Sequence, residues 1–563
     1  MAASRAGERV AAADLGSTAT VWDGPVLVVE DVGQQRLPAR HLVAALEEAG
    51  WPARLVDLMP GLNDPASLIT LVRAVRPRLV VFSILFASHV PETLALIAAL
   101  RQAAVASHVT LTGHLPFFAA AELLAACPGL DSVVAGEAEV AAVALAGSLP
   151  ASERWQTVPG LVFRGSAGGV VRTAPSTAGR ARYRAAVSGR CEDDRGVDDG
   201  VDATVSLAGA LDRLPLARQP DPLPTWGGVG FATLEASRGC YHACAFCLPC
   251  AFYRALGPAY RLRGIPHLVD EIEALVRRGA RLFLFDDEQF LPPHPQRAAR
   301  VAAFGDELAR RRLTIAFTLK CRADDVESEL FRQLRDMGLR RVYVGIESGC
   351  QATLDHLAKG VGRANNLTAL QTLADLGIVA DFRCLLFHPW STWGTVAEDM
   401  AFCRQVAPLL STLLDWREVE VYPGTGLARR LRCEARAAGD PWPLSYAVPD
   451  ARAELLRRVN RVVVGAAPIF HACQAEVTAA WFELLLARRF RPSDRDMADA
   501  RRLQAIVQQG NLALLAVWER MLEFSAQVDI GDAAPVNAAA AAWAAAVSLA
   551  CLEIQRALAA RAA

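Results

Sequence analysis

Eight consecutive residues hold three cysteines, Cys240, Cys244 and Cys247. This C-x3-C-x2-C array directly follows the run 230–237, which reads as a β-strand. A tight loop with this spacing can wrap three thiolates around one face of a cuboidal iron–sulfur cluster. Three protein ligands on a four-iron cluster leave one iron free to bind a substrate or cofactor. The chain is therefore expected to fold around a cluster-binding loop at the end of a strand.

Two other kinds of metal site could use these cysteines. A structural zinc site would need a fourth Cys or His at a second knuckle. A bacterial ferredoxin frame would use Cys244, Cys247 and Cys250, and it should continue with three residues, a cysteine and a proline. Arg254 and Ala255 stand in those two places. The frame that begins at Cys240 is therefore preferred.

Length and charge limit the fold and the partners. A chain of 563 residues is too long for one core and suggests about three domains. The formal net charge of -1 argues against a nucleic-acid surface. Residues 1–23 read as a flexible tail, and the uncharged run 538–552 reads as a packed helix. We expect a soluble, cytoplasmic protein with no nucleic-acid and no membrane partner.

Short apolar runs alternate with helical patterns over residues 24–150. Such runs are typical of strands that are buried on both faces. The expected strands are Pro25–Glu30, Ala53–Leu58, Leu79–Ser83, Val109–Gly113 and Ser132–Ala135. This alternation predicts a doubly wound, Rossmann-like α/β sheet, which binds ligands beyond the carboxyl ends of its strands.

A proline-rich linker is expected within residues 151–228, and a second βα series follows it. The strands of this series end in polar segments, namely Asp286-Asp287-Glu288, Lys320-Cys321-Arg322, Glu347-Ser348-Gly349 and His388-Pro389-Trp390. Barrels of βα units place their chemistry at this edge. Residues 229–430 are therefore expected to form a catalytic domain. Residues 431–563 have helical periodicity and are expected to cap the barrel mouth and bind substrate.

Two regions carry a family resemblance. The cysteine loop, with Phe246 before its last cysteine, resembles the signature of the radical S-adenosylmethionine (SAM) enzymes. The segments 112–116 and 127–137 resemble the cobalamin-binding domain that precedes many radical SAM cores, although they lack an Asp-x-His-x-x-Gly motif. The whole chain resembles the cobalamin-dependent (class B) radical SAM methyltransferases. That resemblance implies a Rossmann-like cobalamin domain, a partial (β/α)6 TIM barrel and an α-helical C-terminal domain.

The resemblance also implies cofactors and their ligands. Cys240, Cys244 and Cys247 would hold a [4Fe-4S] cluster. The implied SAM-binding residues are Phe246, Asp286, Asp287, Lys320, Arg322, Glu347 and Ser348. The implied cobalamin-binding residues are Gly33, Ser83, Phe86, Gly113, His114, Gly136 and Glu137. His388-Pro389-Trp390 replaces the family's frequent Gly-x-Pro, so the adenine contact stays unassigned, as does any further catalytic residue.

The activity that the resemblance implies is transfer of a methyl group from SAM, through methylcobalamin, to an unactivated carbon of a natural-product or amino-acid substrate. In one subgroup, the tryptophan methylases of thiopeptide biosynthesis, a glutamate closes the free iron site, and Glu271 or Glu273 could do so here. Tryptophan is then one candidate substrate. Expected partners are a small-molecule or peptide substrate and an external reductant of the flavodoxin or ferredoxin type. A non-methylating enzyme of oxidation, cyclisation or ring contraction, and a binding module without turnover, remain alternatives.

Overall fold

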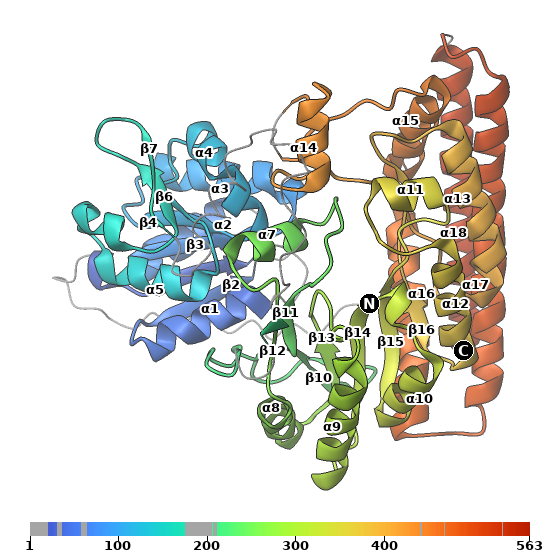
Figure 1. Ribbon diagram of the computed structural model, residues 1–563, viewed down its shortest axis with the longest axis horizontal. Coiled ribbons are helices and arrows are strands. Elements are labelled where there is room, and N and C mark those ends of the chain that lie inside the picture. The colour runs from blue at the N-terminus through green and yellow to red at the C-terminus, as the bar shows by residue number, and fades with distance from the viewer. Residues whose placement is uncertain are drawn as a thin grey trace. The chain divides into compact units, whose positions relative to one another are not determined.

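The computed structural model of the chain forms two compact units, which are drawn in Figure 1. The first contains Met1–Val187 with Leu214–Arg218, and the second contains Ser188–Arg213 and Gln219–Ala563. The structure describes residues 21–30, 37–57, 65–174, 205–206, 211–439, 442–466, 468–531 and 533–562.

The first unit is built on a seven-stranded sheet with the order β2-β1-β3-β4-β5-β6-β7. Strands β1 to β5 are parallel, as the sequence predicted. The strands are β1 (Val26–Glu30), β2 (Ala53–Asp57), β3 (Leu79–Ser83), β4 (His108–Thr112), β5 (Ser132–Val134), β6 (Leu161–Arg164) and β7 (Val170–Arg172). The helices are α1 (Leu37–Glu48), α2 (Pro65–Val75), α3 (Val90–Gln102), α4 (His114–Ala126) and α5 (Ala138–Ser148). Every residue of β1, β3 and β4 is buried, because helices cover both faces of a doubly wound sheet.

The first sheet extends beyond residue 150, into the range expected to be linker. Strand β6 pairs antiparallel with β5, and β7 pairs antiparallel with β6. The turn between β6 and β7 contains Gly168 at a φ of 80°, a left-handed conformation that glycine adopts without strain. The apolar run that forms β6 therefore completes the first sheet instead of leading away from it.

The second unit contains a partial βα barrel, which confirms the predicted fold class. Its six-stranded sheet has the order β16-β15-β14-β13-β10-β9, and a β17–β18 pair joins it through a bridge between Glu347 and Cys384. The strands are β9 (Thr225–Trp226), β10 (Val229–Leu234), β13 (Ala280–Phe285), β14 (Ala316–Arg322), β15 (Leu339–Gly345), β16 (Val379–Asp381), β17 (Cys384–Phe387) and β18 (Trp416–Glu418). A small separate sheet contains β8 (Val205–Ser206), β11 (Ser237–Gly239) and β12 (Tyr260–Leu262).

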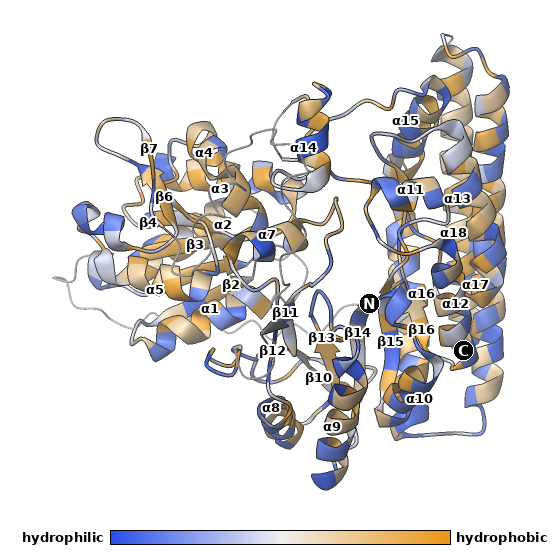
Figure 2. Cartoon of the chain, in the orientation of Figure 1, coloured by the Kyte–Doolittle hydropathy of each residue, from blue (hydrophilic) through white to orange (hydrophobic). Residues whose placement is uncertain are grey.

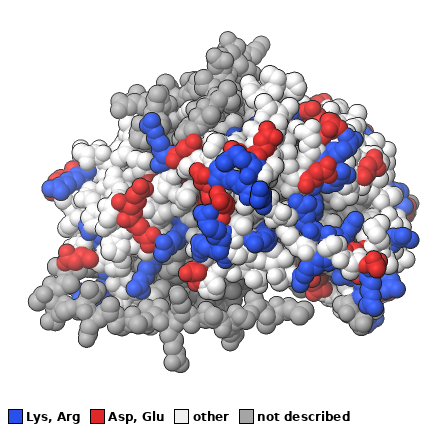
Figure 3. All heavy atoms as spheres, turned by 90° about the horizontal axis from the view of Figure 1, so that it is seen from below, with Lys and Arg blue, Asp and Glu red and all other residues white. Residues whose placement is uncertain are grey.

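Eight helices lie between or after the strands of this barrel. They are α7 (Leu248–Leu256), α8 (Ile265–Arg277), α9 (Gln296–Arg310), α10 (Ser328–Met337), α11 (Gln351–His356), α12 (Arg363–Asp375), α13 (Trp393–Val406) and α14 (Gly426–Cys433). The apolar sides of α8, α9, α10, α12 and α13 share one hydrophobic core with residues of the barrel strands, whereas α14 packs in a separate apolar cluster. Figure 2 shows hydrophilic and hydrophobic residues side by side on these helices. On the face drawn in Figure 3, acidic and basic side chains lie intermixed.

The C-terminal segment belongs to the second unit and shares the barrel's core. Its helices are α15 (Ala451–Ala466), α16 (Ile469–Phe490), α17 (Asp496–Gln527) and α18 (Ala533–Ala562). Phe482 and Leu486 of α16 pack against Val229, Leu282 and Ala316, which lie near the amino ends of three barrel strands. This helix therefore closes the end of the barrel opposite the predicted chemistry, in contrast to the expected cap over the mouth.

Helix α18 is long and apolar enough to cross a membrane by length and composition, with a mean hydropathy of 1.5 over Ala534–Arg561. It packs against α15, α16 and α17, and 39% of its apolar window is buried inside the protein. Trp543 and Val547 of α18 belong to the shared core. This packing agrees with the expectation of a packed helix.

Candidate functional site

The cysteine loop runs between β11 and α7 and is fixed at several backbone atoms. Gly239 precedes it with a φ of 89°, and a Cβ atom there would lie 2.2 Å from the carbonyl oxygen of Ala259. Only glycine fits this close approach. Within the loop, the Ala245 amide donates to the Leu357 carbonyl at 2.9 Å, and its carbonyl accepts from the Leu427 amide at 2.9 Å. The loop is thus held by segments that follow β15 and β18.

Four sulfur atoms gather at this loop. Cys240 is buried, Cys244 and Cys247 are half-buried, and the buried Cys250 thiol hydrogen-bonds with both Cys240 and Cys247. Arg322 Nη1 lies 3.6 Å from Cys244 Sγ. Among the described residues, no three His, Cys, Asp or Glu side chains converge closely enough to hold a single metal ion. Three thiols on one loop beside a guanidinium are a soft, anion-stabilising donor set, which fits an iron–sulfur cluster.

The three acidic side chains after β13, Asp286, Asp287 and Glu288, lie in different environments. Asp287 is fully buried and points back toward β10, where it accepts from the Ala236 amide at 3.1 Å and the Ser237 hydroxyl at 2.5 Å. Burial raises the pKa of Asp287 to about 7. Asp286 is 39% exposed and pairs with Lys320 at 2.6 Å. Glu288, which the sequence analysis did not select, accepts from the Gly239 amide at 3.0 Å, next to Cys240.

In the structure the Asp287 carboxylate is hydrogen-bonded to the Ala236 amide and the Ser237 hydroxyl. Its expected contact with the methionine amino group stays a prediction. Glu288 lies next to the cysteine loop through the Gly239 amide, and Asp286 lies beside Lys320. Successive residues beyond a strand point in different directions, so three adjacent acids could not be told apart from their order alone.

A buried ion pair lies after β15. Glu347 Oε1 accepts from Lys359 Nζ at 2.7 Å, and the two side chains are 11% and 5% exposed. Both Cys244 and Arg322 act electrostatically on Lys359, so this pair adjoins the cysteine loop. Glu347 was expected at the site, whereas Lys359 was not. Its only sequence signal is a cation twelve residues after Glu347, across a short helix.

The predicted residue Ser348 is fully buried. Its hydroxyl donates to Asp399 Oδ1 at 2.6 Å. Asp399 also accepts from the Gly349 amide at 2.6 Å. Ser348 therefore supports the backbone of this turn, and its direct contact with SAM stays a prediction.

The segment after β17 packs Trp390 between two neighbours. His356 stacks on one face of its ring at a centroid distance of 5.7 Å and an interplanar angle of 18°. The guanidinium of Arg430 lies 3.7 Å from the ring centroid. His388 is fully buried, and burial lowers its pKa to about 3, so the ring is neutral. Because Trp390 already has stacking partners, it is a poor adenine platform. Phe246 packs in the same apolar cluster as Trp390.

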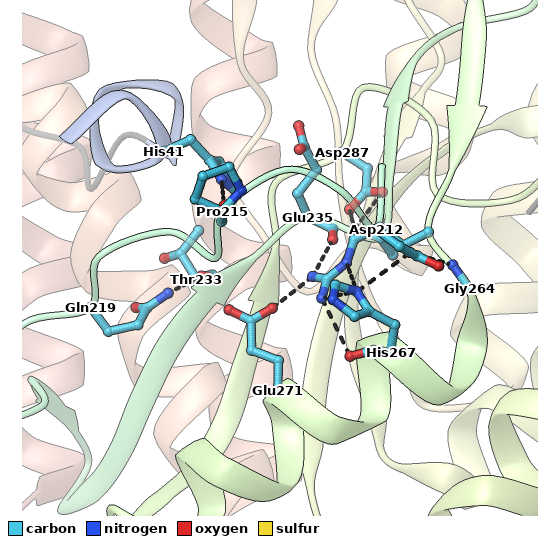
Figure 4. Close-up of polar contacts among 12 residues, drawn as sticks. His41, Asp212, Pro215, Gln219, Thr233, Glu235, Gly264, His267, Glu271 and Asp287 are labelled. Atoms are coloured by element: carbon cyan, nitrogen blue, oxygen red, sulfur yellow. Dashed lines mark hydrogen bonds and ion pairs between the residues drawn. The ribbon is translucent and has the colours of Figure 1, made fainter. Parts of the chain in front are cut away.

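The two proposed fourth ligands of the cluster are engaged elsewhere. Glu271, drawn in Figure 4, is 5% exposed and accepts from Arg263 Nη1 at 2.6 Å. Glu273 pairs with Arg277 and with Arg311, each at 3.0 Å. Both belong to α8, which packs on α9. The acid that acts electrostatically on Cys240 is Glu288, so the structure does not bring Glu271 or Glu273 to the cysteines.

The expected cobalamin residues in the first unit gather at the carboxyl edge of its sheet. Ser83 ends β3, Gly113 and His114 follow β4, and Gly136 and Glu137 follow β5. Phe86 is 40% exposed just beyond β3. Gly33 lies outside the described residues. An edge with glycines at two strand ends and an exposed aromatic ring fits a large flat cofactor, because such sheets bind ligands at this edge.

A Cβ atom would not be tolerated at one of these glycines. Gly113 has a φ of 124°, and its Cβ would lie 2.0 Å from the carbonyl oxygen of Ile84. The chain after β4 therefore approaches the chain after β3 directly through its backbone. Glu30, the last residue of β1, is 1% exposed at the same edge and was not selected from the sequence.

Comparison with known protein families assigns both units. Residues 32–146 match the B12 binding domain, and residues 234–399 match the radical SAM superfamily. The cofactors expected from the sequence, cobalamin, SAM and a [4Fe-4S] cluster, are those of these two domains.

Two curated relatives illustrate the sequence similarity. The hopanoid C-3 methylase of Methylococcus capsulatus is 25% identical over 394 residues, which cover 68% of this chain and 66% of the methylase. An anaerobic magnesium-protoporphyrin IX monomethyl ester cyclase of Rubrivivax gelatinosus is 29% identical over 198 residues, or 35% of this chain and 34% of the cyclase. The chain thus spans just under two thirds of the first relative and about one third of the second.

Two solved structures share the fold. The cobalamin-dependent SAM radical enzyme OxsB superposes with a TM-score of 0.62 at 16% identity, covering 93% of this chain and 84% of OxsB. The radical SAM methyltransferase TsrM from Kitasatospora setae, solved with cobalamin and a [4Fe-4S] cluster, gives a TM-score of 0.55 at 19% identity. That match covers 74% of this chain and 76% of TsrM.

Proposed function

Because this chain belongs to the cobalamin-dependent radical SAM enzymes, we propose that it is a methyltransferase that moves a methyl group from SAM through cobalamin to an unactivated carbon. Support comes from the sequence similarity to a hopanoid C-3 methylase, which covers 68% of the chain. The bound cofactors would supply one-electron reduction of SAM and carriage of the methyl group. The protein's part is to bind, orient and shield them.

The observation that carries the proposal is the convergence of the cysteine loop with charged groups from three strand ends. Cys240, Cys244 and Cys247 would hold the cluster. Carboxylates after β13 suit the ammonium group of SAM, and cations suit its carboxylate. In this assignment, the carboxylates of Asp286 and Glu288 bind the ammonium group of SAM. The cations of Arg322 and Lys359 bind its carboxylate. Glu347 would then contact the ribose or the methionine.

The barrel wall beyond Glu347 favours a polar substrate. Arg341 and Asp381 form an ion pair across β15 and β16. Asp415 pairs with Arg383 at 3.3 Å and with Arg417 at 2.7 Å. These arginines are 25%, 50% and 38% exposed, so water reaches this wall. A hydrocarbon placed there would strip water from charges without replacing their interactions, which is costly. An amino acid, with tryptophan as one candidate, or another polar natural product fits better than a hopanoid-like lipid.

The test uses the anaerobically reconstituted chain with an external reductant and SAM that carries a trideuterated methyl group. Candidate substrates such as free tryptophan are incubated, and the products are analysed by mass spectrometry. Transfer of three deuterium atoms to a carbon of the product supports the proposal. A turned-over product without the label identifies the alternative, a non-methylating oxidation or cyclisation, which the similarity to the cyclase of Rubrivivax gelatinosus keeps in view.

A further inference from the structure

The backbone after β15 takes an unusual path at Glu347. This residue has a φ of 62°, which lies in the left-handed region that residues other than glycine and asparagine rarely adopt. The chain makes two successive three-residue turns, one just before Glu347 and one centred on it, because the Ile346 amide donates to the Val344 carbonyl and the Ser348 amide donates to the Ile346 carbonyl. Such a conformation persists only where surrounding groups hold it.

Two buried side chains from separate helices hold this turn. Asp399 of α13 accepts three hydrogen bonds at Oδ1, from the Ser348 hydroxyl at 2.6 Å, the Gly349 amide at 2.6 Å and the Cys350 amide at 3.0 Å. Asn366 of α12 donates its amide group to the Ile346 carbonyl at 2.9 Å and to the Ser348 carbonyl at 2.8 Å. Five hydrogen bonds thus fix the segment 346–350.

Helix α13 also closes the turn by packing. Phe402 lies one turn after Asp399 on the same helix face. A Cβ atom at Gly349 would lie 2.1 Å from the Phe402 ring. Asp399 is 1% exposed and Asn366 is fully buried, so neither side chain can touch a ligand. Both hold the backbone of the segment 346–350, in which Glu347 is the one charged side chain.

We infer that Asp399 and Asn366 are positioning residues for SAM, which set the Glu347 carboxylate through the backbone of the turn 346–350. This inference rests on the proposed role of Glu347 in binding SAM. It assigns to the outer helices α12 and α13 a part in cofactor recognition that neither residue could take by contact.

The two side chains differ in which atoms they use, and this difference makes the inference testable. Asp399 uses only Oδ1, and its Oδ2 has no partner. Asn366 uses only its amide nitrogen, and its Oδ1 has no partner. In Asp399→Asn, the amide group can take the place of Oδ2 and leave all three acceptor bonds intact. In Asn366→Asp, both donors are lost and a carboxylate oxygen faces two carbonyl oxygens. Two substitutions of equal size should therefore have opposite outcomes.

The experiment measures the dissociation constant of S-adenosylhomocysteine for the full, cluster-reconstituted chain, together with iron and sulfide content and the thermal midpoint. Asp399→Asn should stay within about threefold of the wild type. Asn366→Asp and Asp399→Leu should weaken binding at least tenfold while the cluster content is unchanged. Addition of SAM should perturb the paramagnetic resonance spectrum of the reduced cluster in Asp399→Asn as it does in the wild type, and less in Asn366→Asp.

A matched control separates positioning from general stability. Asn511 of α17 is also fully buried and also holds two backbone groups, the Leu414 amide and the Thr412 carbonyl. Asn511→Asp should lower the thermal midpoint without changing the affinity for S-adenosylhomocysteine. If the variants at Asn366 and Asp399 also lose only stability, the inference is overturned. Should they fail to fold, Ser348→Ala, which removes one donor to Asp399, must still weaken binding by about threefold or more.

The failure of the proposed function would look different. A folded, cluster-loaded wild-type chain that does not bind S-adenosylhomocysteine would remove the SAM site itself. Wild-type binding with unchanged affinity in Asn366→Asp would leave the SAM site in place and remove only the positioning role. Equal losses in Asp399→Asn and Asp399→Leu would also overturn the inference, because the charge and not the hydrogen-bond geometry would then matter.

Discussion

Lys359 Nζ lies 2.7 Å from Glu347 Oε1 in a place where the two side chains are only 5% and 11% exposed. Each charge of such a pair can be buried only because the opposite charge lies beside it. Removal of one partner leaves an unpaired buried charge, which costs about 3 kcal/mol or more of stability. The pair also faces the space beside Cys244, where the SAM carboxylate is proposed to bind.

Substitution at this pair should separate its structural role from its binding role. Lys359→Met should lower the free energy of unfolding by about 3 kcal/mol and weaken S-adenosylhomocysteine binding. The double variant Lys359→Met with Glu347→Gln removes both charges and should regain most of the stability, but not the affinity. Urea unfolding and equilibrium dialysis measure the two quantities. Full affinity in the double variant would mean that the pair is purely structural.

The two cysteine frames predict different consequences of single substitutions. In the frame that begins at Cys240, alanine at Cys240, Cys244 or Cys247 abolishes the cluster, whereas alanine at Cys250 preserves it. In the ferredoxin frame, Cys250 is required and Cys240 is dispensable. Iron and labile sulfide per chain after anaerobic reconstitution decide between them. A Cys240→Ala preparation with full cluster content would reverse the assignment made here.

The architecture could be predicted from the sequence because its strands are short and apolar on both faces. The runs 25–30 and 79–83 are too short for a helix and rich in valine, which favours buried strands. The limit of the first sheet was harder to see, because β6 and β7 join it antiparallel, after the βα alternation has ended. The segment 378–387, which is apolar over most of its length, forms two strands, β16 and β17, with a break at Phe382 and Arg383 that its sequence does not mark.

The candidate site could be predicted where one strand or loop supplies the residues, and not where distant helices do. The three cysteines and Glu347 are adjacent to their strand ends, so their place follows from local sequence. Lys359 bonds to Glu347 from 12 residues further along the chain, and Asp399 bonds to Ser348 from 51 residues further along. No periodicity connects such positions. The burial of Asp287 could not be predicted, because a strand end does not reveal which of its acids turns back into the core.

Gly113 tests the cobalamin edge of the first unit. Gly113→Ala would place a methyl group 2.0 Å from the Ile84 carbonyl oxygen in a left-handed backbone conformation. We expect a loss of about 3 kcal/mol in the stability of this unit, and loss of bound cobalamin. Gly168→Ala is the matched control, because its φ is 80° and no atom lies within 4 Å of its Cβ position. That control should cost about 1 kcal/mol and retain cobalamin. The prediction fails if Gly113→Ala retains cobalamin in the wild-type amount.

A buried histidine should make the first unit sensitive to acid. His108 Nε2 lies 2.8 Å from Ser132 Oγ between β4 and β5, and burial lowers its pKa to about 4, despite Asp131 nearby. Between pH 6.5 and 4 the unfolded chain binds a proton at His108 that the folded chain does not, so stability falls as the pH falls. The full effect is about 3 kcal/mol, at 1.36 kcal/mol for each unit of pKa. It is absent above pH 6.5.

The variant His108→Gln keeps a polar group near Ser132 but cannot titrate in this range. Its stability at pH 7 should be lower than that of the wild type, because Gln does not reproduce the edge-on packing of the ring against Trp155 at 4.7 Å. Its loss of stability between pH 7 and pH 5 should nevertheless be smaller than that of the wild type. Urea unfolding at the two pH values measures both slopes. Equal slopes would show that His108 is protonated in the folded protein or that other groups dominate its acid response.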